Sequence, residues 1–415
     1  MRIAVIGAGV VGVTTAYELS LAGHEVMLVD AAEAVAQVSS FANGGQLSYS
    51  YVAPLAGPGV LPSVPSWLIR ADSPLRFRPR LSGRQWRWLT SFVLACRASV
   101  SESSTTALLQ LAELSRTVLH ATVEREALQF DWGKTGKLIV YRDHSQFAKA
   151  KKLVAYQATQ GSSQRLLSAQ ETVALEPALA NMADRIAGAI YTPTEESGDC
   201  QRFTAQLAAR LAQRPGVTFH MGTRVLGFEK QGGVITHART TQGDIAADAF
   251  VIAGGMGSRD LLSALGQDVP LYALKGYSFT LARSACAGEV PTISVTDYQR
   301  RILYARLGDT VRIAGMVDIG TSDGAADAER QAMLQAQVHE LFPDWDFSNA
   351  RAWTGLRPAT PKGLPIIGAS HVANNLWMNV GQGALGFTLA CGSARLLSTM
   401  ISGQTLPLRA TAFRP

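Results

Sequence analysis

The fold is decided near the start of the chain, where residues 2–12 read RIAVIGAGVVG. The apolar run 2–6 is typical of a buried strand, and three glycines follow it within a few residues. A helical stretch then extends to Leu21, and a second apolar run, 25–29, ends on Asp30. Strand, glycine-rich turn, helix, strand and acid in this order predict a Rossmann-type dinucleotide-binding unit.

Each residue of this pattern has a physical task. Gly7 permits the tight turn, Gly9 lets the backbone approach a pyrophosphate, and Gly12 lets the helix pack closely on the sheet. The helix start offers unpaired N–H groups and a partial positive charge to the phosphates. Asp30 falls where a carboxylate can accept hydrogen bonds from an adenosine ribose. The predicted dinucleotide site consists of Gly7, Gly9, Val10, Val11, Gly12 and Asp30.

Length and composition describe an ordinary globular protein. The 415 residues are 47% apolar and 17% charged, which favours about two domains. A first strand at residue 2 leaves no room for a signal peptide, and no run of about 18 uncharged apolar residues predicts a membrane span. The four cysteines form no CxxC pair and the seven histidines are scattered, so neither disulfides nor a metal site is predicted. We therefore expect a reducing compartment on the cytoplasmic side.

Residues 65–97 form a strongly basic segment, with seven arginines against the single acid Asp72. Aromatic residues are interleaved with the arginines. One interpretation is an insertion whose aromatic rings cover the core while its arginines stay hydrated. The other is a surface that docks on anionic lipid headgroups, as a peripheral contact with the inner membrane. Nucleic acid is not expected as a partner, because no nucleic-acid-binding module accompanies the charge. The segment contains Arg70, Arg76, Arg78, Arg80, Arg84, Arg87, Arg97, Trp67, Phe77, Trp86, Trp88 and Phe92.

Two later segments favour a flavin over a nicotinamide cofactor. Residues 246–253 are typical of a buried strand and lead into two glycines, and the strand 376–380 leads into GQGALG and a helix. The second glycine pattern is too near the chain end to begin another nucleotide-binding unit, so one site assembled from both ends of the chain is expected. The last helix would direct its positive end at a flavin ring. These segments add Gly254, Gly255, Gly381, Gly383, Ala384, Leu385 and Gly386 to the predicted cofactor site.

Several blocks resemble one group of flavoenzymes. These are SSFANGGQLS (39–48), SGDC (197–200), LKGYS (274–278), WTGLRPATPKGLPIIG (353–368) and GQGALGFTLACGSARLL (381–397). Together with the opening motif, they are similar to the small, FAD-carrying subunit of bacterial D-amino-acid dehydrogenases, in the glycine oxidase and D-amino-acid oxidase group. The resemblance covers nearly the whole chain in order.

The resemblance implies an α/β fold in which a Rossmann-like FAD-binding domain is interrupted by a substrate domain. The FAD domain would comprise residues 1–50, 190–265 and 352–415. The substrate domain, with a mainly antiparallel sheet and helices, would comprise residues 51–189 and 266–351. The sequence independently favours helices at 105–127 and 146–160 and strands at 302–305 and 311–315.

The resemblance also implies site residues. Arg357, in GLRP, would clamp the substrate carboxylate, the alternative being a structural salt bridge. Tyr304 would face the flavin and hydrogen-bond the carboxylate, and Tyr277 is a second candidate; either tyrosine could instead pack in the core. The segment around residue 40 would pass close to the flavin and pyrophosphate, through Ser39, Ser40, Asn43, Gly44 and Gly45. Cys391 is interpreted as a packing thiol.

The implied function is oxidation of D-amino acids to 2-oxo acids and ammonia by hydride transfer to FAD. None of the five later blocks contains a histidine, and hydride transfer from a neutral amine needs no residue to remove the α-proton. Electrons would pass to a quinone or another carrier. Three alternatives remain open: a dehydrogenase of D-proline, hydroxyproline or sarcosine, an oxidase that uses O₂, and a non-catalytic FAD-binding subunit. The intact Arg357 and Tyr304 argue against the non-catalytic subunit.

Overall fold

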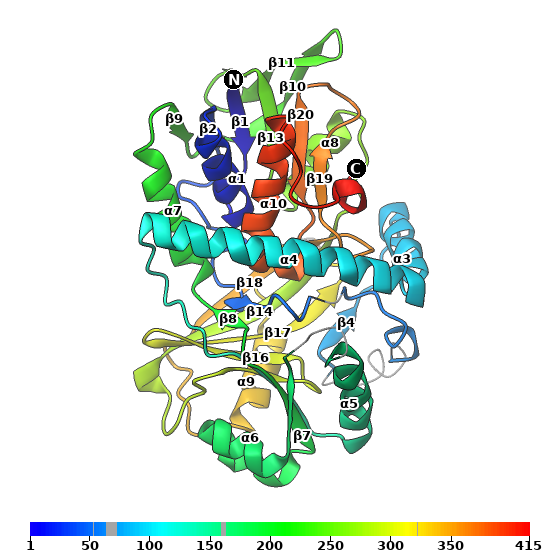
Figure 1. Ribbon diagram of the computed structural model, residues 1–415, viewed down its shortest axis with the longest axis vertical. Helices are drawn as coiled ribbons and strands as arrows, with labels where there is room; N and C mark the ends of the chain where they lie inside the picture. The colour runs from blue at the N-terminus through cyan, green and yellow to red at the C-terminus, as the bar shows by residue number, and fades with distance from the viewer. Residues whose placement is uncertain (53, 64–72, 159–162, 322) are drawn as a thin grey trace.

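The computed structural model describes residues 1–52, 54–63, 73–158, 163–321 and 323–415. Two large sheets make up the molecule, one above the other in Figure 1. The long helix α4 (Ala98–Glu126) crosses the view at the level where the sheets meet. One sheet is largely parallel and the other mainly antiparallel, so the predicted α/β class is confirmed.

The six-stranded sheet has the order β19-β20-β13-β1-β2-β9. All its neighbouring strands run parallel except β19, which pairs antiparallel with β20 at one edge. Its strands are short runs of Val, Ile and Leu because both faces of a parallel sheet are covered. The strands are β1 (Arg2–Ile6), β2 (Glu25–Val29), β9 (Val217–His220), β13 (Ala249–Ile252), β19 (Ile366–Ala369) and β20 (Leu376–Val380).

Helices cover one face of this sheet and a small sheet covers the other. The helical layer contains α1 (Val10–Leu21), α7 (Cys200–Ala212), α10 (Gly386–Ile401) and α4, which share one hydrophobic core. On the other face lie α8 (Gly257–Ala264) and the strands β10 (Val225–Gln231), β11 (Val234–Thr240) and β12 (Ile245–Ala246). Gly392 lets α10 approach α4 closely, since a Cβ there would lie 2.6 Å from the Leu111 carbonyl oxygen.

The stretch Gly383–Ile401 is long and apolar enough, by length and composition alone, to cross a membrane. This qualifies the expectation that no such span exists. However, the helix carries Arg395, and 67% of its apolar window is buried between neighbouring elements. Its contacts with α1 and α4 are those of a central core helix.

The nine-stranded sheet has the order β18-β14-β17-β16-β15-β5-β7-β6, and β4 pairs with β17 beside this path. Only β15–β5 and β17–β4 are parallel pairs. The strands are β4 (Leu75–Phe77), β5 (Lys137–Tyr141), β6 (Arg165–Leu167), β7 (Gly188–Thr192), β14 (Tyr272–Ala282), β15 (Ser294–Asp297), β16 (Ile302–Leu307), β17 (Thr310–Ile319) and β18 (Arg351–Ala359). Strand β18 lies almost entirely within the range predicted for the FAD domain, yet it pairs with β14 in this sheet.

The remaining elements pack around this sheet or join the two halves. The predicted helices 105–127 and 146–160 are present as α4 and α5 (His144–Ala158). Others are α3 (Gly83–Ala95), α6 (Ala169–Leu175), α9 (Ala328–His339) and the pair β3 (Gln46–Leu47) and β8 (Glu196–Ser197). Short 3₁₀ turns occupy η1 (Leu61–Ser63), η2 (Pro177–Arg185), η3 (Arg283–Ala285), η4 (Gly383–Leu385) and η5 (Ala410–Phe413).

Gly12 sets the distance between α1 and the turn that precedes it. A Cβ at this position would lie 1.7 Å from the Gly7 carbonyl oxygen. This oxygen belongs to the backbone, so it cannot move aside without displacing the glycine-rich turn. We expect Gly12→Ala to lower the free energy of unfolding by about 3 kcal/mol. Urea denaturation followed by circular dichroism measures this. The matched control is Gly83→Ala in the first turn of α3, where a Cβ meets nothing within 4 Å. Equal stability of the two variants would contradict the packing argument.

Candidate active site

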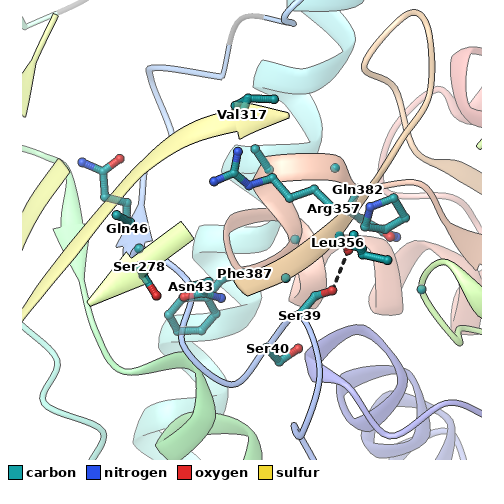
Figure 2. A pocket seen from close by; sticks show the side chains of 18 of the residues that line it. Ser39, Ser40, Asn43, Gln46, Ser278, Val317, Leu356, Arg357, Gln382 and Phe387 are labelled. Atoms are coloured by element: carbon teal, nitrogen blue, oxygen red, sulfur yellow. Dashed lines mark hydrogen bonds between the residues drawn. The ribbon is translucent and has the colours of Figure 1, made fainter. Parts of the chain in front are cut away.

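A cavity of about 1920 Å³ is lined by residues of both large sheets. It begins at the glycine-rich turn after β1 and extends to β5 and β15 in the nine-stranded sheet. Figure 2 shows part of it, with side chains converging from the segment around residue 40, from β14, β17 and β18, and from the start of α10.

Most of the predicted cofactor residues line this cavity. They are Gly7, Gly9, Val10, Val11, Asp30, Ser39, Ser40, Asn43, Gly44, Gly45, Gly254, Gly255, Gly383, Ala384 and Gly386. Three others lie behind its wall. Gly12 packs against the turn, Gly381 packs against Thr360 and Leu271, and Leu385 contacts the core beside the start of α10.

The glycine-rich turn has the geometry that a dinucleotide requires. Gly7 has φ +113°, and a Cβ there would lie 2.6 Å from the Ala253 carbonyl oxygen, so only glycine fits. A Cβ at Gly9 would meet only the Ser40 Oγ, at 3.3 Å, so its backbone can be approached from the cavity. The N-terminal end of α1 faces the same space. This turn therefore fits a pyrophosphate.

Asp30 links the turn to the second strand. One carboxylate oxygen accepts the Ala8 N–H at 2.6 Å and the other accepts the Ala32 N–H at 2.8 Å. The carboxylate also lines the cavity, and its remaining lone pairs can accept hydroxyl groups. Asp30 thus has a structural task that the sequence did not indicate, in addition to the predicted ribose contact.

Residues 39–47, the crossing segment, run from the dinucleotide turn to the nine-stranded sheet. Ser40 Oγ accepts the Val10 N–H at 3.0 Å, at the start of α1. Ser39 Oγ donates to the Leu356 carbonyl at 2.7 Å, which is the dashed line in Figure 2. Asn43 Oδ1 accepts the Gly45 N–H at 3.0 Å and so holds the tight turn. The two glycines let this backbone pass close to Leu303 and Leu307 of β16.

The start of α10 forms another wall of the cavity. Gln382, Gly383, Ala384 and Phe387 line it, so the positive end of this helix is directed into the cavity. The N-terminal ends of two helices therefore face the cavity: that of α1, at the glycine-rich turn, and that of α10. This arrangement and the volume fit FAD, with its pyrophosphate at α1 and its ring toward α10.

Arg357 points into the cavity from β18, below Val317 in the view of Figure 2. Gly276 on the neighbouring strand makes room for it, since a Cβ there would lie 2.3 Å from Arg357 Nη2. Burial lowers the pKa of the guanidinium, and no carboxylate opposes that effect. In the described part of the chain we find no hydrogen bond or ion pair for this side chain. The alternative of a structural salt bridge is therefore not supported.

The prediction that Tyr304 faces the cavity is wrong. Side chains alternate along β16, and it is Leu303 that lines the cavity. Tyr304 is 1% exposed on the opposite face, where its ring packs edge-on against Phe342 and Trp345 at 5.4 and 6.4 Å between centroids. Burial raises the pKa of its hydroxyl. Tyr304 is a core residue.

Tyr277 lies at the edge of the cavity, but its hydroxyl is already engaged. It donates to Asp318 Oδ2 at 2.7 Å, and burial together with this bond raises its pKa. Asp318 also pairs with Arg76 and Arg330, so the network joins β4, β14, β17 and α9. Donation from Tyr277 to a substrate carboxylate would break this network.

The sequence reasoning missed two polar residues of the cavity. Gln46 and Lys137 both line it and hydrogen-bond to each other, Lys137 Nζ to Gln46 Oε1, at 3.1 Å. Lys137 is buried on β5, a strand whose other members are all apolar or aromatic. In the sequence GKLIVY, a lysine at the start of an apolar strand could have indicated that this charged side chain has a function.

The cysteines behave as packing residues. All four are free and buried, and Cys391 lies in the core of α10 as predicted. The described residues contain no group of three or more His, Cys, Asp or Glu side chains that could hold a metal.

A family model described as FAD dependent oxidoreductase (DAO) matches residues 2–400. The chain belongs to this family. Proteins named D-amino acid dehydrogenase 2 from Ralstonia nicotianae and Pseudomonas aeruginosa are each 45% identical to it, with 100% of this chain and 99% and 98% of theirs covered. Among solved structures, glycine oxidase from Geobacillus kaustophilus has a TM-score of 0.78 at 19% identity, covering 100% of this chain and 98% of that one. At that identity the likeness establishes the shared fold. The family confirms FAD as the cofactor.

Asp30 provides a test of the cofactor site. Asp30→Ala removes the acceptor of two backbone N–H groups and of the ribose hydroxyls, so we expect FAD to bind at least about tenfold more weakly. Titration of the FAD-free protein with FAD, followed by quenching of flavin fluorescence, measures the dissociation constant. Glu33→Ala is the control, because Glu33 is exposed on the same loop and does not line the cavity. If the two variants bind FAD alike, Asp30 makes no cofactor contact.

Proposed function

We propose that this protein is a D-amino-acid dehydrogenase that converts its substrates to 2-oxo acids and ammonia. The observation that carries the proposal is Arg357, a guanidinium that pairs with none of the described residues and faces the cavity holding the dinucleotide turn. A planar guanidinium binds both oxygens of a carboxylate at once. Full-length relatives at 39–45% identity carry the name D-amino acid dehydrogenase, which supports the substrate class.

In the proposed reaction the protein mainly orients the substrate. Arg357 fixes the α-carboxylate, and the apolar side chains of Leu303, Met316 and Val317 wall the cavity nearby and exclude water. The substrate reacts with its amine neutral, and the nitrogen lone pair becomes the new C=N bond as the α-hydrogen leaves as hydride. Bound FAD supplies the acceptor of this hydride. Water then hydrolyses the imino acid to the 2-oxo acid and ammonia.

Arg357→Lys tests the carboxylate clamp. An ammonium cannot form two parallel bonds to a carboxylate, and a misaligned α-C–H reacts slowly. We expect FAD content to be retained while kcat/KM for D-alanine falls more than about tenfold, equivalent to about 1.4 kcal/mol of transition-state stabilisation. Steady-state kinetics with an artificial electron acceptor measure this. Arg351→Lys, exposed at the start of the same strand, is the matched control. A smaller loss in Arg357→Lys would make Arg357 peripheral to the reaction.

We further propose that electrons leave to a quinone or another carrier, and that the protein reaches the cytoplasmic face of the inner membrane through the α3 surface. This surface comprises the exposed apolar side chains Trp86, Val93 and Leu94 of α3 and Leu81 just before it. Exposed large apolar residues gathered on and beside one helix are typical of an interaction surface. Trp67, Arg70 and Asp72, from the basic segment, lie outside the described residues.

The described part of the basic segment supports its interpretation as a cover for the core. Trp88 is buried and its Nε1 donates to the Ala359 carbonyl at 3.0 Å, so part of the segment covers the core. Arg76 forms ion pairs with Asp318 and Asp327, and Arg87 pairs with Asp268 at 3.1 Å. Much of the positive charge is therefore neutralised within the protein. The apolar face of α3, more than the arginines, supports membrane contact.

Liposome co-sedimentation tests the α3 surface. We expect the wild-type protein to pellet with anionic vesicles, and the double variant Trp86→Ser/Leu94→Ser to pellet several-fold less. Raising the salt from 0.01 to 0.1 M shortens the screening length from roughly 30 to 10 Å and should weaken only the electrostatic part. Leu166→Ser, an exposed leucine on β6, is the control. If the double variant and the control pellet alike, α3 is not the contact.

A further inference from the structure

The part of the cavity formed by the nine-stranded sheet is lined by cations without lining acids. Among the described residues, Asp30 and Asp260 are the only acids in the lining of the cavity as a whole, and both lie at the dinucleotide end. The other end carries Lys137, Arg142, Lys149, Arg300, Arg301 and Arg357. Asp297 pairs with Arg142, and Glu340 pairs with Arg300. The other four have no such partner in the described part of the chain, and of these Lys149 and Arg301 are exposed, whereas Lys137 is buried and Arg357 half-buried.

Lys137 is the more unusual of these two cations, because it is only 5% exposed. Its ammonium donates to Gln46 Oε1 at 3.1 Å and to Ser48 Oγ at 3.2 Å, both neutral acceptors. The Tyr51 ring lies 4.3 Å from Nζ. An ammonium has three donors, so these two hydrogen bonds leave one for a ligand.

Glu195 is the carboxylate whose charge acts on this ammonium, but the two do not form an ion pair. Both oxygens of Glu195 accept backbone N–H groups, from Tyr49 at 2.6 Å and from Ser50 at 2.7 Å. No described carboxylate lies within ion-pair distance of Lys137. Burial lowers the pKa of Lys137 to about 8, against the opposing effect of the Glu195 charge. A buried ammonium with no carboxylate at ion-pair distance is only partly compensated, and a ligand carboxylate in direct contact would compensate it further.

Gln46 connects this ammonium to the segment that runs through the cavity. It belongs to the crossing segment, and its Nε2 donates to Ser294 Oγ on β15 at 2.9 Å. In Figure 2 the Arg357 guanidinium extends toward the side of the view on which Gln46 lies, with a strand passing between them in this view. Since Gln46, Lys137 and Arg357 all line one cavity, a ligand long enough to span this part of it would meet Arg357 at one end and Gln46 and Lys137 at the other.

From this arrangement we propose that Lys137 is a specificity-determining residue that selects D-amino acids with a side-chain carboxylate. This inference rests on the proposed function. Arg357 would hold the α-carboxylate, and Lys137 would donate its remaining N–H to the side-chain carboxylate. The ligand would thereby bring a carboxylate into direct contact with the ammonium, which no described residue of the protein does.

Substrate pairs of equal shape test the proposal in the wild-type holoenzyme. D-glutamate and D-aspartate are compared with D-glutamine and D-asparagine, which replace the carboxylate with a neutral amide. We expect kcat/KM to favour the better acidic substrate over its amide by about ten- to hundredfold, the range of a charge-assisted hydrogen bond. Equal kcat/KM values within both pairs would overturn the proposal.

Lys137→Met, of similar length but neutral, should bring the ratio of kcat/KM for the acidic substrate to kcat/KM for its amide close to one. Lys134→Met, an exposed lysine near the start of the same strand, is the control and should keep the preference. Loss of activity on acids and amides alike would assign Lys137 to folding or to the α-carboxylate instead, and would overturn the proposal.

Ligand binding gives a second readout that does not depend on turnover. Glutarate carries two carboxylates and butyrate only one, and their binding to the FAD-loaded protein can be followed by the flavin absorbance spectrum. We expect glutarate to bind at least about tenfold more tightly than butyrate in the wild type and about equally in Lys137→Met. Equal binding in the wild type would overturn the inference. By contrast, a flavin that no D-amino acid reduces anaerobically would overturn the proposed function.

Discussion

The crossing segment, residues 39–47, is the constraint on which the rest of the site depends. It is tied to the dinucleotide half through Ser40, which accepts the Val10 N–H, and to the substrate half through Ser39, which donates to the Leu356 carbonyl. Ser278 of β14 also donates to the Ala42 carbonyl at 2.7 Å. These bonds fix the distance between the glycine turn and β18, which sets the distance between a bound flavin and Arg357.

Arg312 supports this segment from behind. It is 2% exposed, and its guanidinium donates to the Asn43 carbonyl at 2.5 Å and to Thr280 Oγ1 at 2.8 Å. Asp199, 3.3 Å away, supplies the compensating charge and also caps α7. A backbone carbonyl in a tight turn is thereby held by a cation that is itself anchored to a sheet and a helix. Asp199 belongs to the sequence block SGDC. It does not line the cavity, but it supports the crossing segment through Arg312.

Local pattern was enough to predict the dinucleotide half of the molecule. The tasks of Gly7, Gly9 and Gly12 follow from backbone geometry within a few residues, and the structure places each glycine as that geometry requires. The prediction that Tyr304 faces the cavity was wrong because a local pattern does not contain the information needed. A period of two tells which residues share a face of a strand, but not which face turns to the cavity. That choice depends on α9 and the segment after it, whose aromatic rings receive Tyr304.

Other features depend on contacts between residues far apart in the chain. The assignment of β18 to the nine-stranded sheet follows from its pairing with β14, which no local pattern shows. Lys137 was missed because its neighbours in GKLIVY predict only a buried strand. Its significance appears when Gln46 and Ser48, about ninety residues earlier in the chain, are found beside its ammonium.

The shielded cations of this protein differ in whether a carboxylate pairs with them. We use this difference to distinguish structural roles from ligand-binding roles. Arg312 and Arg330 are deeply buried and each has a carboxylate partner, Asp199 and Asp318 respectively. Such pairs hold elements together, and removal of one member leaves the other uncompensated. Lys137 is buried and Arg357 half-buried, but no described carboxylate lies within ion-pair distance of either. Both of these line the cavity, whereas Arg312 and Arg330 do not. Desolvation of a cation that has no ion-pair partner must be offset elsewhere in the structure. The position of both cations in one cavity is the arrangement expected when the anions that contact them arrive with the ligand.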